Sequence, residues 1–362
     1  MKNKSYHLIY FLLHPFFSLI YYLKNFRKKN AKNVIWLFTV FFGFTLAIGK
    51  ESQGSDIVGY MEEIPLLHGK VFSLSTAVKY FLASGEIDIV RTFLSILVSR
   101  FTDNGYYLVI VFAIIFGYFF SRNMWFVLDR LKGKLKPFIV LLIIVLFLVV
   151  PIWFLGGFRF WTAAHVFTYG CLHYFYNYEP KKVIWAILTP FLFHFAFLLP
   201  LFLLLLHMIS GSKLKLYYFF FLLSLLVSEI NIGLFNTYIE SYAPEILQER
   251  TESYRSETAL EKLERKQTMN TTVWYAEYQN KFLSWPVFFI LIVGYWKFKK
   301  FINNDMQLRT IFSFSFLFLG VSNIMANLPS GGRYQSVALL FALSALIIYL
   351  QNKNYDKTIT NI

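Results

Sequence analysis

The stretch VIWAILTPFLFHFAFLLPLFLLLLHM, residues 183–208, decides how this chain is folded. It contains no Asp, Glu, Lys or Arg, but it carries Pro190, His194 and Pro200 within a few turns of one another. One straight helix over these residues would be roughly 39 Å long, whereas the hydrocarbon core of a bilayer is roughly 30 Å thick. The segment is therefore either a long single crossing or two shorter arms joined at a break.

The positions of the basic residues around this segment favour one of the two arrangements. They cluster in short runs beside apolar segments, at 24–32, 122–136, 181–182, 213–215 and 297–300. If 183–208 crosses once, the last two runs lie on the opposite side from the first. If it enters and returns, every basic run and the tail 351–357 lie on one side, as the positive-inside rule requires. We therefore predict a broken, re-entrant hairpin, whose irregular backbone would line a protein cavity.

Composition extends this reading to the whole chain. Of 362 residues, 57% are hydrophobic and only 15% are charged, against roughly 25% charged in soluble domains. The other apolar runs of helix length lie at about 7–23, 34–49, 105–121, 137–155, 158–176, 214–230, 284–299, 308–327 and 334–350. The sequence therefore predicts an all-α, polytopic integral membrane protein with about 10–11 membrane helices, forming a single membrane domain over 1–362.

The formal charge of +15 would suggest nucleic-acid binding in a soluble protein. Here the Lys and Arg runs flank apolar segments, which is typical of cytoplasmic loops held at anionic lipid. We therefore expect a lipid bilayer as partner and no nucleic acid. The single cysteine, Cys171, can form no intramolecular disulfide and is interpreted as a packing residue.

The predicted topology places two large segments outside, about 50–104 and about 231–283. Within the second, residues 243–269 have the charge pattern of an exposed helix, acidic early and basic late. In the first, residues 85–101 have apolar residues at helical spacing together with Arg91 and Arg100. That pattern predicts a helix lying along the outer interface.

Two arginines also fall at the outer face. Arg159 follows two glycines in GGFR, and Arg333 follows two glycines in PSGGRY, each at the start of an apolar helix. An arginine near a helix end can simply extend its head group to water. Two guanidiniums on one face instead favour an anionic ligand, because their planar donor set matches phosphate oxygens.

Several other polar residues are candidates for chemistry. His194, at the turn of the hairpin, would face a polar cavity and could take a proton, although a packing role is equally open. Asp56 and Tyr60 are four residues apart, so one helical turn would put them on the same face; a solvated loop is the alternative. His165 and His173 favour interhelical hydrogen bonds. No zinc-ligand spacing is present, so we expect no metal.

Together these motifs resemble those of the EpsG family, the Wzy-like polymerases of bacterial exopolysaccharide and O-antigen synthesis. The resemblance runs from SDIVGY (55–60) through GGFRFWTAAHVFTYGCLHYF (156–175) and FHFAFLLP (193–200) to GGRY (331–334). It covers nearly the whole chain, although its motifs are short. It places Asp56, Tyr60, Arg159, His194 and Arg333 on the family pattern.

The resemblance implies a glycosyltransferase of GT-C-like architecture in the bacterial cytoplasmic membrane, with its active site facing outward. Such an enzyme transfers a glycan from a polyprenyl-pyrophosphate carrier to a carrier-linked repeat unit, with inversion and without a cofactor. Arg159 and Arg333 would bind the pyrophosphate. His194 or Asp56 would be the general base, with His194 preferred and Asp56 expected to position the acceptor. Tyr60 and Arg91 are expected at the glycan. A flippase and a chain-length regulator are the protein partners implied.

Two other classes stay open from the sequence. A lipid-linked glycan transporter would show pseudo-symmetric halves and charges near the bilayer midplane, and neither is evident. A membrane O-acyltransferase modifying surface glycans also uses arginines and histidines, but its acyl donor would come from the cytoplasmic side. A histidine that opens inward would therefore favour the acyltransferase.

Overall fold

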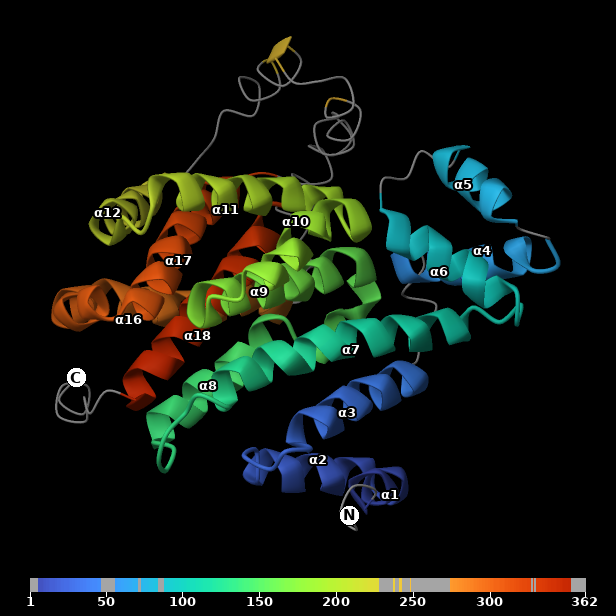
Figure 1. Cartoon of the computed structure of the whole chain (residues 1–362), viewed down its shortest axis with the longest axis horizontal. Helices are drawn as coiled ribbons and strands as arrows, with labels where there is room; N and C mark the ends of the chain where they lie inside the picture. The colour runs from blue at the N-terminus through green and yellow to red at the C-terminus, as the bar shows by residue number, and fades with distance from the viewer. Residues whose placement is uncertain are drawn as a thin grey trace. The chain divides into compact units, whose positions relative to one another are not determined.

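A computed structural model of the chain describes residues 6–46, 56–70, 73–83, 88–227, 274–326, 328 and 330–352, and singly residues 237, 241, 242 and 248. In this part of the chain, helices are joined by turns and no β-strand occurs (Figure 1). The prediction of an all-α fold is confirmed. The predicted helix at 243–269 lies outside the described residues, apart from Gln248.

The chain divides into two compact units that are interleaved in sequence. Unit 1 comprises 1–136, 150–202 and 351–362, and unit 2 comprises 137–149 and 203–350. Neither unit is one contiguous stretch. The single membrane domain expected over 1–362 stays a prediction.

At the amino-terminal end of unit 1, two helices lie where the sequence has one apolar run of helix length. The apolar run 7–23 forms α1 (Tyr6–Leu13) and α2 (Pro15–Lys24), with a kink at His14. Pro15 is the cause, since a proline disfavours helical dihedrals in the residue before it, and His14 has φ −145° and ψ 80°. The prediction of one unbroken helix there is wrong.

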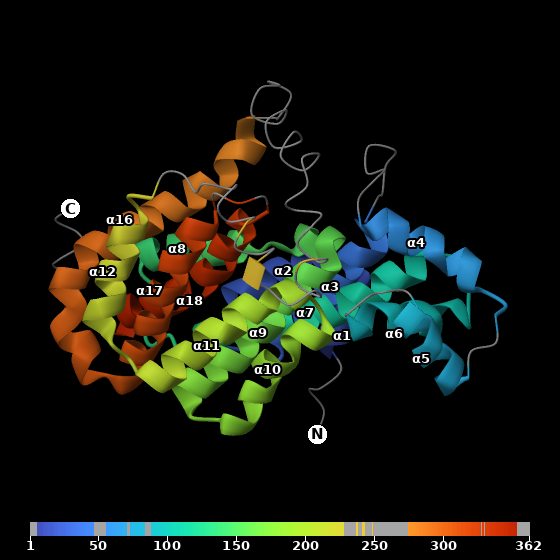
Figure 2. The same cartoon turned by 90° about the horizontal axis from the view of Figure 1, so that it is seen from above.

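The centre of unit 1 is α7 (Tyr106–Leu128), with α3 (Ala31–Thr45) along one side of it and α9 (Phe158–Asn177) along another (Figures 1 and 2). Small residues allow the close approach of α3 to α7. A Cβ added at Gly43 would lie 2.4 Å from the Cβ of Ala113. Such small-residue contacts are typical of helix packing in membranes, where van der Waals contact drives association.

Three short helices of unit 1 come from the first segment predicted outside. They are α4 (Asp56–Leu67), α5 (Leu74–Ala83) and α6 (Ile89–Ser99), packed around a small core of Leu67, Ala77 and Ile96. The helix expected within 85–101 is therefore present as α6.

The break predicted within 183–208 is also present. Helix α10 (Val183–Leu192) ends, a 3-10 turn spans Phe195–Phe197, and α11 (Leu198–Ser210) follows. His194 is extended, with φ −162° and ψ 120°. The path of the two arms through a membrane stays a prediction.

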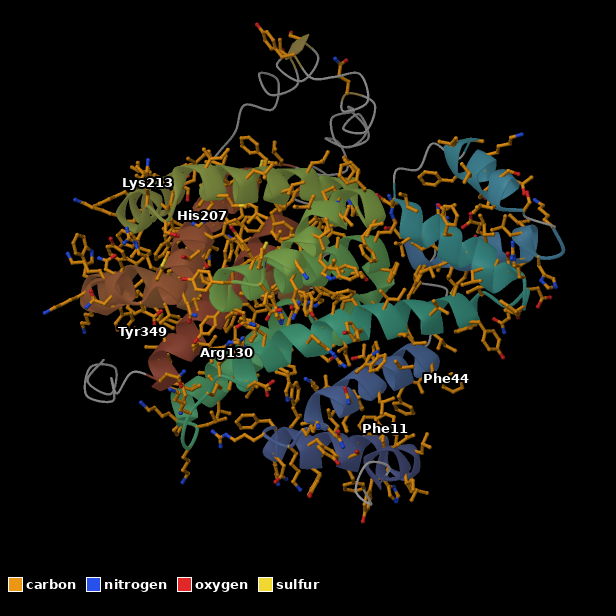
Figure 3. All side chains as sticks on the ribbon, viewed as in Figure 1. Phe11, Phe44, Arg130, His207, Lys213 and Tyr349 are labelled. Atoms are coloured by element: carbon orange, nitrogen blue, oxygen red, sulfur yellow. The ribbon has the colours of Figure 1, made fainter. Side chains whose placement is uncertain are left out.

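Unit 2 is built from the remaining long helices: α8 (Pro137–Val149), α12 (Leu214–Ser224), α16 (Trp274–Asn304), α17 (Met306–Met325) and most of α18 (Gly332–Asn352). Helix α12 packs along α17, where a Cβ at Gly320 would lie 2.5 Å from the Phe220 ring. His207 Nε2, on the part of α11 in this unit, lies 2.7 Å from Ser313 Oγ of α17. Figure 3 labels His207, Lys213 at the start of α12, and Tyr349 on α18.

By length and composition, five helical segments of the described chain can cross a membrane: 106–128, 137–177, 281–300, 306–325 and 332–352. The segment 137–177 contains α8, a 3-10 turn at Ile152–Gly157, and α9. Shorter apolar helices lie at 31–45, 89–99, 195–210 and 214–224. The protein is therefore helical and of polytopic membrane type, while the expected number of 10–11 crossings stays a prediction.

In unit 1 the basic loops meet at one end. The Arg27 side chain donates to the carbonyl of Leu131 at 3.3 Å, joining loop 24–32 to loop 129–136. Arg130 (Figure 3) donates to Oδ1 of Asn177 at 2.6 Å, which brings in the loop before Lys181. Loops on one side of a membrane would show this arrangement, so it supports the charge argument.

Unit 2 follows the same rule. The Arg309 side chain donates to the carbonyl of Ser212 at 3.2 Å, so the run 213–215 lies beside the first turn of α17. The run 297–300 lies in the last turns of α16, which connects directly to α17. Both basic runs of unit 2 therefore lie at one end of it.

Candidate functional site

A buried carboxylate, Asp88, lies at the centre of a charged cluster in unit 1. Asp88 is the N-cap residue of α6, a position that favours Asp because its side chain can accept from the first backbone N–H groups. It makes no such capping bond. Its side chain, only 1% exposed, is directed to Arg159 instead.

Arg159 is the second residue of α9 and donates to Asp88 with one edge of its guanidinium. Its Nε lies 2.6 Å from Oδ2 of Asp88, and Nη2 forms an ion pair with the same oxygen. Its Nη1 donates to the hydroxyl of Tyr60 at 3.4 Å. The Nε–Nη2 edge, one of the two edges of a guanidinium that can match a phosphate in bidentate fashion, is therefore occupied by the carboxylate.

The other oxygen of Asp88 meets the break between α10 and α11. The backbone N–H of Phe195 donates to Oδ1 at 3.2 Å. His194 supports this turn, because its Nδ1 accepts from the backbone N–H of Ala196 at 3.2 Å. Since Nδ1 accepts, the proton of the neutral ring lies on Nε2.

A second ion pair lies next to the first. Arg91 of α6 donates to Oε2 of Glu63 on α4 at 2.5 Å, and the Tyr80 hydroxyl donates to Oε1 of Glu63 at 2.9 Å. The guanidinium carbon of Arg91 lies 4.9 Å from the centre of the Tyr60 ring, in cation–π geometry. Tyr60 thus joins the two pairs.

We call Tyr60, Glu63, Asp88, Arg91 and Arg159 the Asp88 cluster. Its two guanidiniums balance its two carboxylates, so its formal charge is zero. Burial raises the pKa of Tyr60, and the positive charge of Arg159 opposes part of that rise. The hydroxyl of Tyr60 is therefore protonated at neutral pH and can both donate and accept.

Three of the predicted site residues, Tyr60, Arg91 and Arg159, are brought together in this cluster. His194 precedes Phe195, whose backbone N–H donates to Asp88 of the cluster. Asp56 is exposed at the start of α4, one turn before Tyr60, and its charge acts to raise the pKa of Tyr60.

Arg333 lies in unit 2. It is exposed in the first turn of α18, after a turn in which Ser330 has φ 60°. This is the helix-start position that the sequence predicts. The convergence of Arg333 with Arg159 on one ligand stays a prediction.

Sequence reasoning missed Asp88 and Glu63. A signal for Asp88 was present, since it is a carboxylate between two isoleucines, three residues before Arg91. No local sequence pattern indicates that Asp88 pairs with Arg159, because the two residues are 71 positions apart.

The remaining histidines of α9 have structural contacts. Asn123 of α7 donates to the carbonyl of His165 at 2.8 Å, and its amide lies 3.2 Å from Nδ1 of the same residue, as expected for an interhelical bond. His173 differs from the prediction, since its Nδ1 bonds the carbonyl of Tyr169 in its own helix at 2.9 Å. Cys171 is buried, as expected. Among the described residues, no three His, Cys, Asp or Glu side chains are grouped so that they could hold a metal ion.

No protein-family model, curated protein or solved structure matches the chain. The fold and the site together define a class of protein. It is an all-helical protein of polytopic membrane type with a buried, charge-balanced arginine–carboxylate cluster.

Proposed function

We propose that the protein is a membrane glycosyltransferase of the repeat-unit polymerase type. It would move a glycan from a polyprenyl-pyrophosphate carrier to a carrier-linked acceptor at the outer face of a bacterial cytoplasmic membrane. The observation that carries the proposal is the placement of Arg159. It lies at the amino-terminal end of an apolar helix, 20% exposed, and is fixed by Asp88 and Tyr60.

Such a position suits a lipid-linked phosphate. The end of an apolar helix lies at head-group depth, where the pyrophosphate of a polyprenyl carrier lies. The helix N-terminus adds its own partial positive charge. A guanidinium held there before the reaction can stabilise charge that develops on the leaving pyrophosphate.

The neutral charge of the Asp88 cluster sets a further requirement. A pyrophosphate carries more than one negative charge, and the cluster supplies no net positive charge to oppose it. We propose that Arg333 supplies a second cation. Without it, Arg159 would direct the ligand but would bind it weakly.

The proposed reaction is a single inverting displacement. The oxygen of an acceptor hydroxyl attacks the anomeric carbon, the bond from that carbon to the pyrophosphate oxygen breaks, and polyprenyl pyrophosphate leaves with the electron pair. A base takes the hydroxyl proton. Of the two candidate bases, Asp56 suits the role better, because it is exposed, whereas Nδ1 of His194 already accepts from Ala196. Tyr60 and Arg91 would lie toward the glycan.

The GT-C-like architecture, the flippase and the chain-length regulator belong to the same proposal. So does the outward orientation, which rests on the gathering of basic loops at one end of each unit.

The test is reconstitution. Purified protein in liposomes would be given a polyprenyl-pyrophosphate-linked repeat unit, and the products would be separated by gel electrophoresis. A ladder of carrier-linked polymers is expected from wild type and from Arg309→Lys, because Arg309 is not one of the proposed site residues and donates to the carbonyl of Ser212 at the basic end of unit 2. A preparation that makes no ladder, but acylates a glycan when given an acyl donor, would replace the proposal with the acyltransferase.

A further inference from the structure

We infer that Asp88 is a positioning residue for Arg159, and that it restricts the contact of Arg159 with an anionic ligand to the Nη1 edge beside the Tyr60 hydroxyl. Asp88 was not among the residues expected from the sequence. Its effect on a phosphate ligand rests on the proposed function, whereas its hold on Arg159 does not.

Both oxygens of the Asp88 carboxylate are engaged. Oδ2 accepts from Nε of Arg159 at 2.6 Å and pairs with Nη2, and Oδ1 accepts from the Phe195 backbone at 3.2 Å. These donors come from two segments, the start of α9 and the α10–α11 break. One carboxylate therefore holds the arginine and the turn in fixed relation.

The pair of Asp88 and Arg159 is largely shielded from solvent. The Asp88 side chain is 1% exposed and the Arg159 side chain is 20% exposed. A ligand that drew Arg159 away would leave the Asp88 charge buried without its counter-ion, which is strongly unfavourable. Arg159 therefore stays paired when a ligand binds.

The contact with Asp88 determines which edge of Arg159 faces Tyr60. Arg159 donates to Tyr60 through Nη1, the nitrogen that Asp88 does not use. Tyr60 is in turn held by the Arg91 guanidinium, 4.9 Å from its ring centre. An anion would meet Nη1 and the Tyr60 hydroxyl together, one donor from each residue, and not the paired Nε and Nη2 donors.

The test measures the reactivity of Arg159 directly. Phenylglyoxal condenses with the terminal nitrogens of arginine, so an arginine held by a carboxylate reacts slowly. Peptide mass spectrometry of the purified full-length protein would give the rate at each arginine. Asp88→Asn keeps the side-chain shape but removes the charge. It should raise the rate at Arg159 by about tenfold or more, as expected when a charge-assisted hydrogen bond is lost.

Glu63→Gln is the matched control, since it removes the carboxylate of the neighbouring pair. It should raise the rate at Arg91 and leave the rate at Arg159 unchanged. An unchanged rate at Arg159 in folded Asp88→Asn would overturn the inference. If Asp88→Asn does not fold, Asp88→Ser, which also removes the carboxylate, takes its place, and the same rise, or its absence, decides.

A double-mutant cycle tests the consequence for the proposed reaction. If Asp88 acts through Arg159, kcat/KM of Asp88→Asn with Arg159→Lys should equal that of Arg159→Lys alone within about twofold. Additive losses would show that Asp88 acts elsewhere. A wild type that makes no polymer would remove the proposed function, while the labelling rates would still decide whether Asp88 positions Arg159.

Discussion

The hydroxyl of Tyr60 accepts a hydrogen bond from Nη1 of Arg159 at 3.4 Å, across 99 residues of sequence. The same tyrosine ring faces the guanidinium of Arg91. One side chain thus contacts both arginines of the cluster, one through its polar end and one through its aromatic face. This links an ion pair on α4 and α6 to an ion pair at the start of α9.

The raised pKa of Tyr60 should contribute to the pH dependence of the free energy of unfolding. Burial raises its folded-state pKa above 10.0, the ordinary tyrosine value, so the folded protein holds this proton more tightly than the unfolded chain does. The resulting stability is present below pH 10 and is lost as the pH rises through the folded pKa. Wild type should therefore lose more unfolding free energy than Tyr60→Phe between about pH 9 and pH 11. Parallel curves in denaturant titrations would contradict this.

The Glu63–Arg91 pair should matter strongly for stability. The Arg91 side chain is 8% exposed, so Glu63→Ala leaves a buried guanidinium without its carboxylate. We expect a loss of about 3–5 kcal/mol in the free energy of unfolding. Denaturant unfolding in detergent measures it.

The control for that prediction is Glu179→Ala, at the more exposed pair with Lys182, where the two side chains are 37% and 32% exposed. An exposed pair contributes about 0–1 kcal/mol. Equal losses in the two variants would show that the burial of Arg91 does not set the cost.

Arg159→Lys and Arg333→Lys should each reduce polymer formation strongly. A lysine keeps the charge, but one ammonium cannot replace the two donors that Arg159 directs to Asp88. We expect kcat/KM to fall by about 10²-fold or more. Arg309→Lys is the control. Full activity in Arg159→Lys would remove the arginine from the site.

The base can be identified by substitutions that separate capping from catalysis. Asparagine can also accept at a cap position, so His194→Asn should keep the turn and most of the activity if His194 only supports Ala196. Asp56→Asn should reduce the rate by about 10²-fold or more if Asp56 takes the proton. The reverse pattern, an inactive His194→Asn and an active Asp56→Asn, would assign the base to His194.

The path of 183–208 can be read from the two residues that flank it. Lys181 and Lys213 are exposed in the structure, before and after the broken segment. With Cys171→Ser as background, cysteines at both positions should be protected from an impermeant thiol reagent in intact cells. Asp103→Cys, in the segment predicted outside, should react. Reaction at position 213 but not 181 would show a single crossing.

The sequence predicts the helical class and most helix positions because apolar length and loop charge are local properties. It also predicts the break near His194, since the prolines and the loop charges point to it independently. The kink at His14 could have been predicted from Pro15. It was not, because residues 7–23 are apolar without interruption by charge and were interpreted as one run. Tertiary pairings are different: nothing local links Asp88 to Arg159, so the partner of that arginine had to come from the structure.

The contacts of Asp88 have a consequence for biogenesis. A ribosome makes Asp88 71 residues before Arg159 and 107 residues before Phe195. Until those segments arrive, the carboxylate has neither of these partners and is better left in water than buried. Burial of the Asp88 side chain must therefore follow the synthesis of α9 and of the turn after α10. A chain truncated before residue 195 would present an incompletely satisfied charge, a form that quality-control proteases could distinguish from the finished protein.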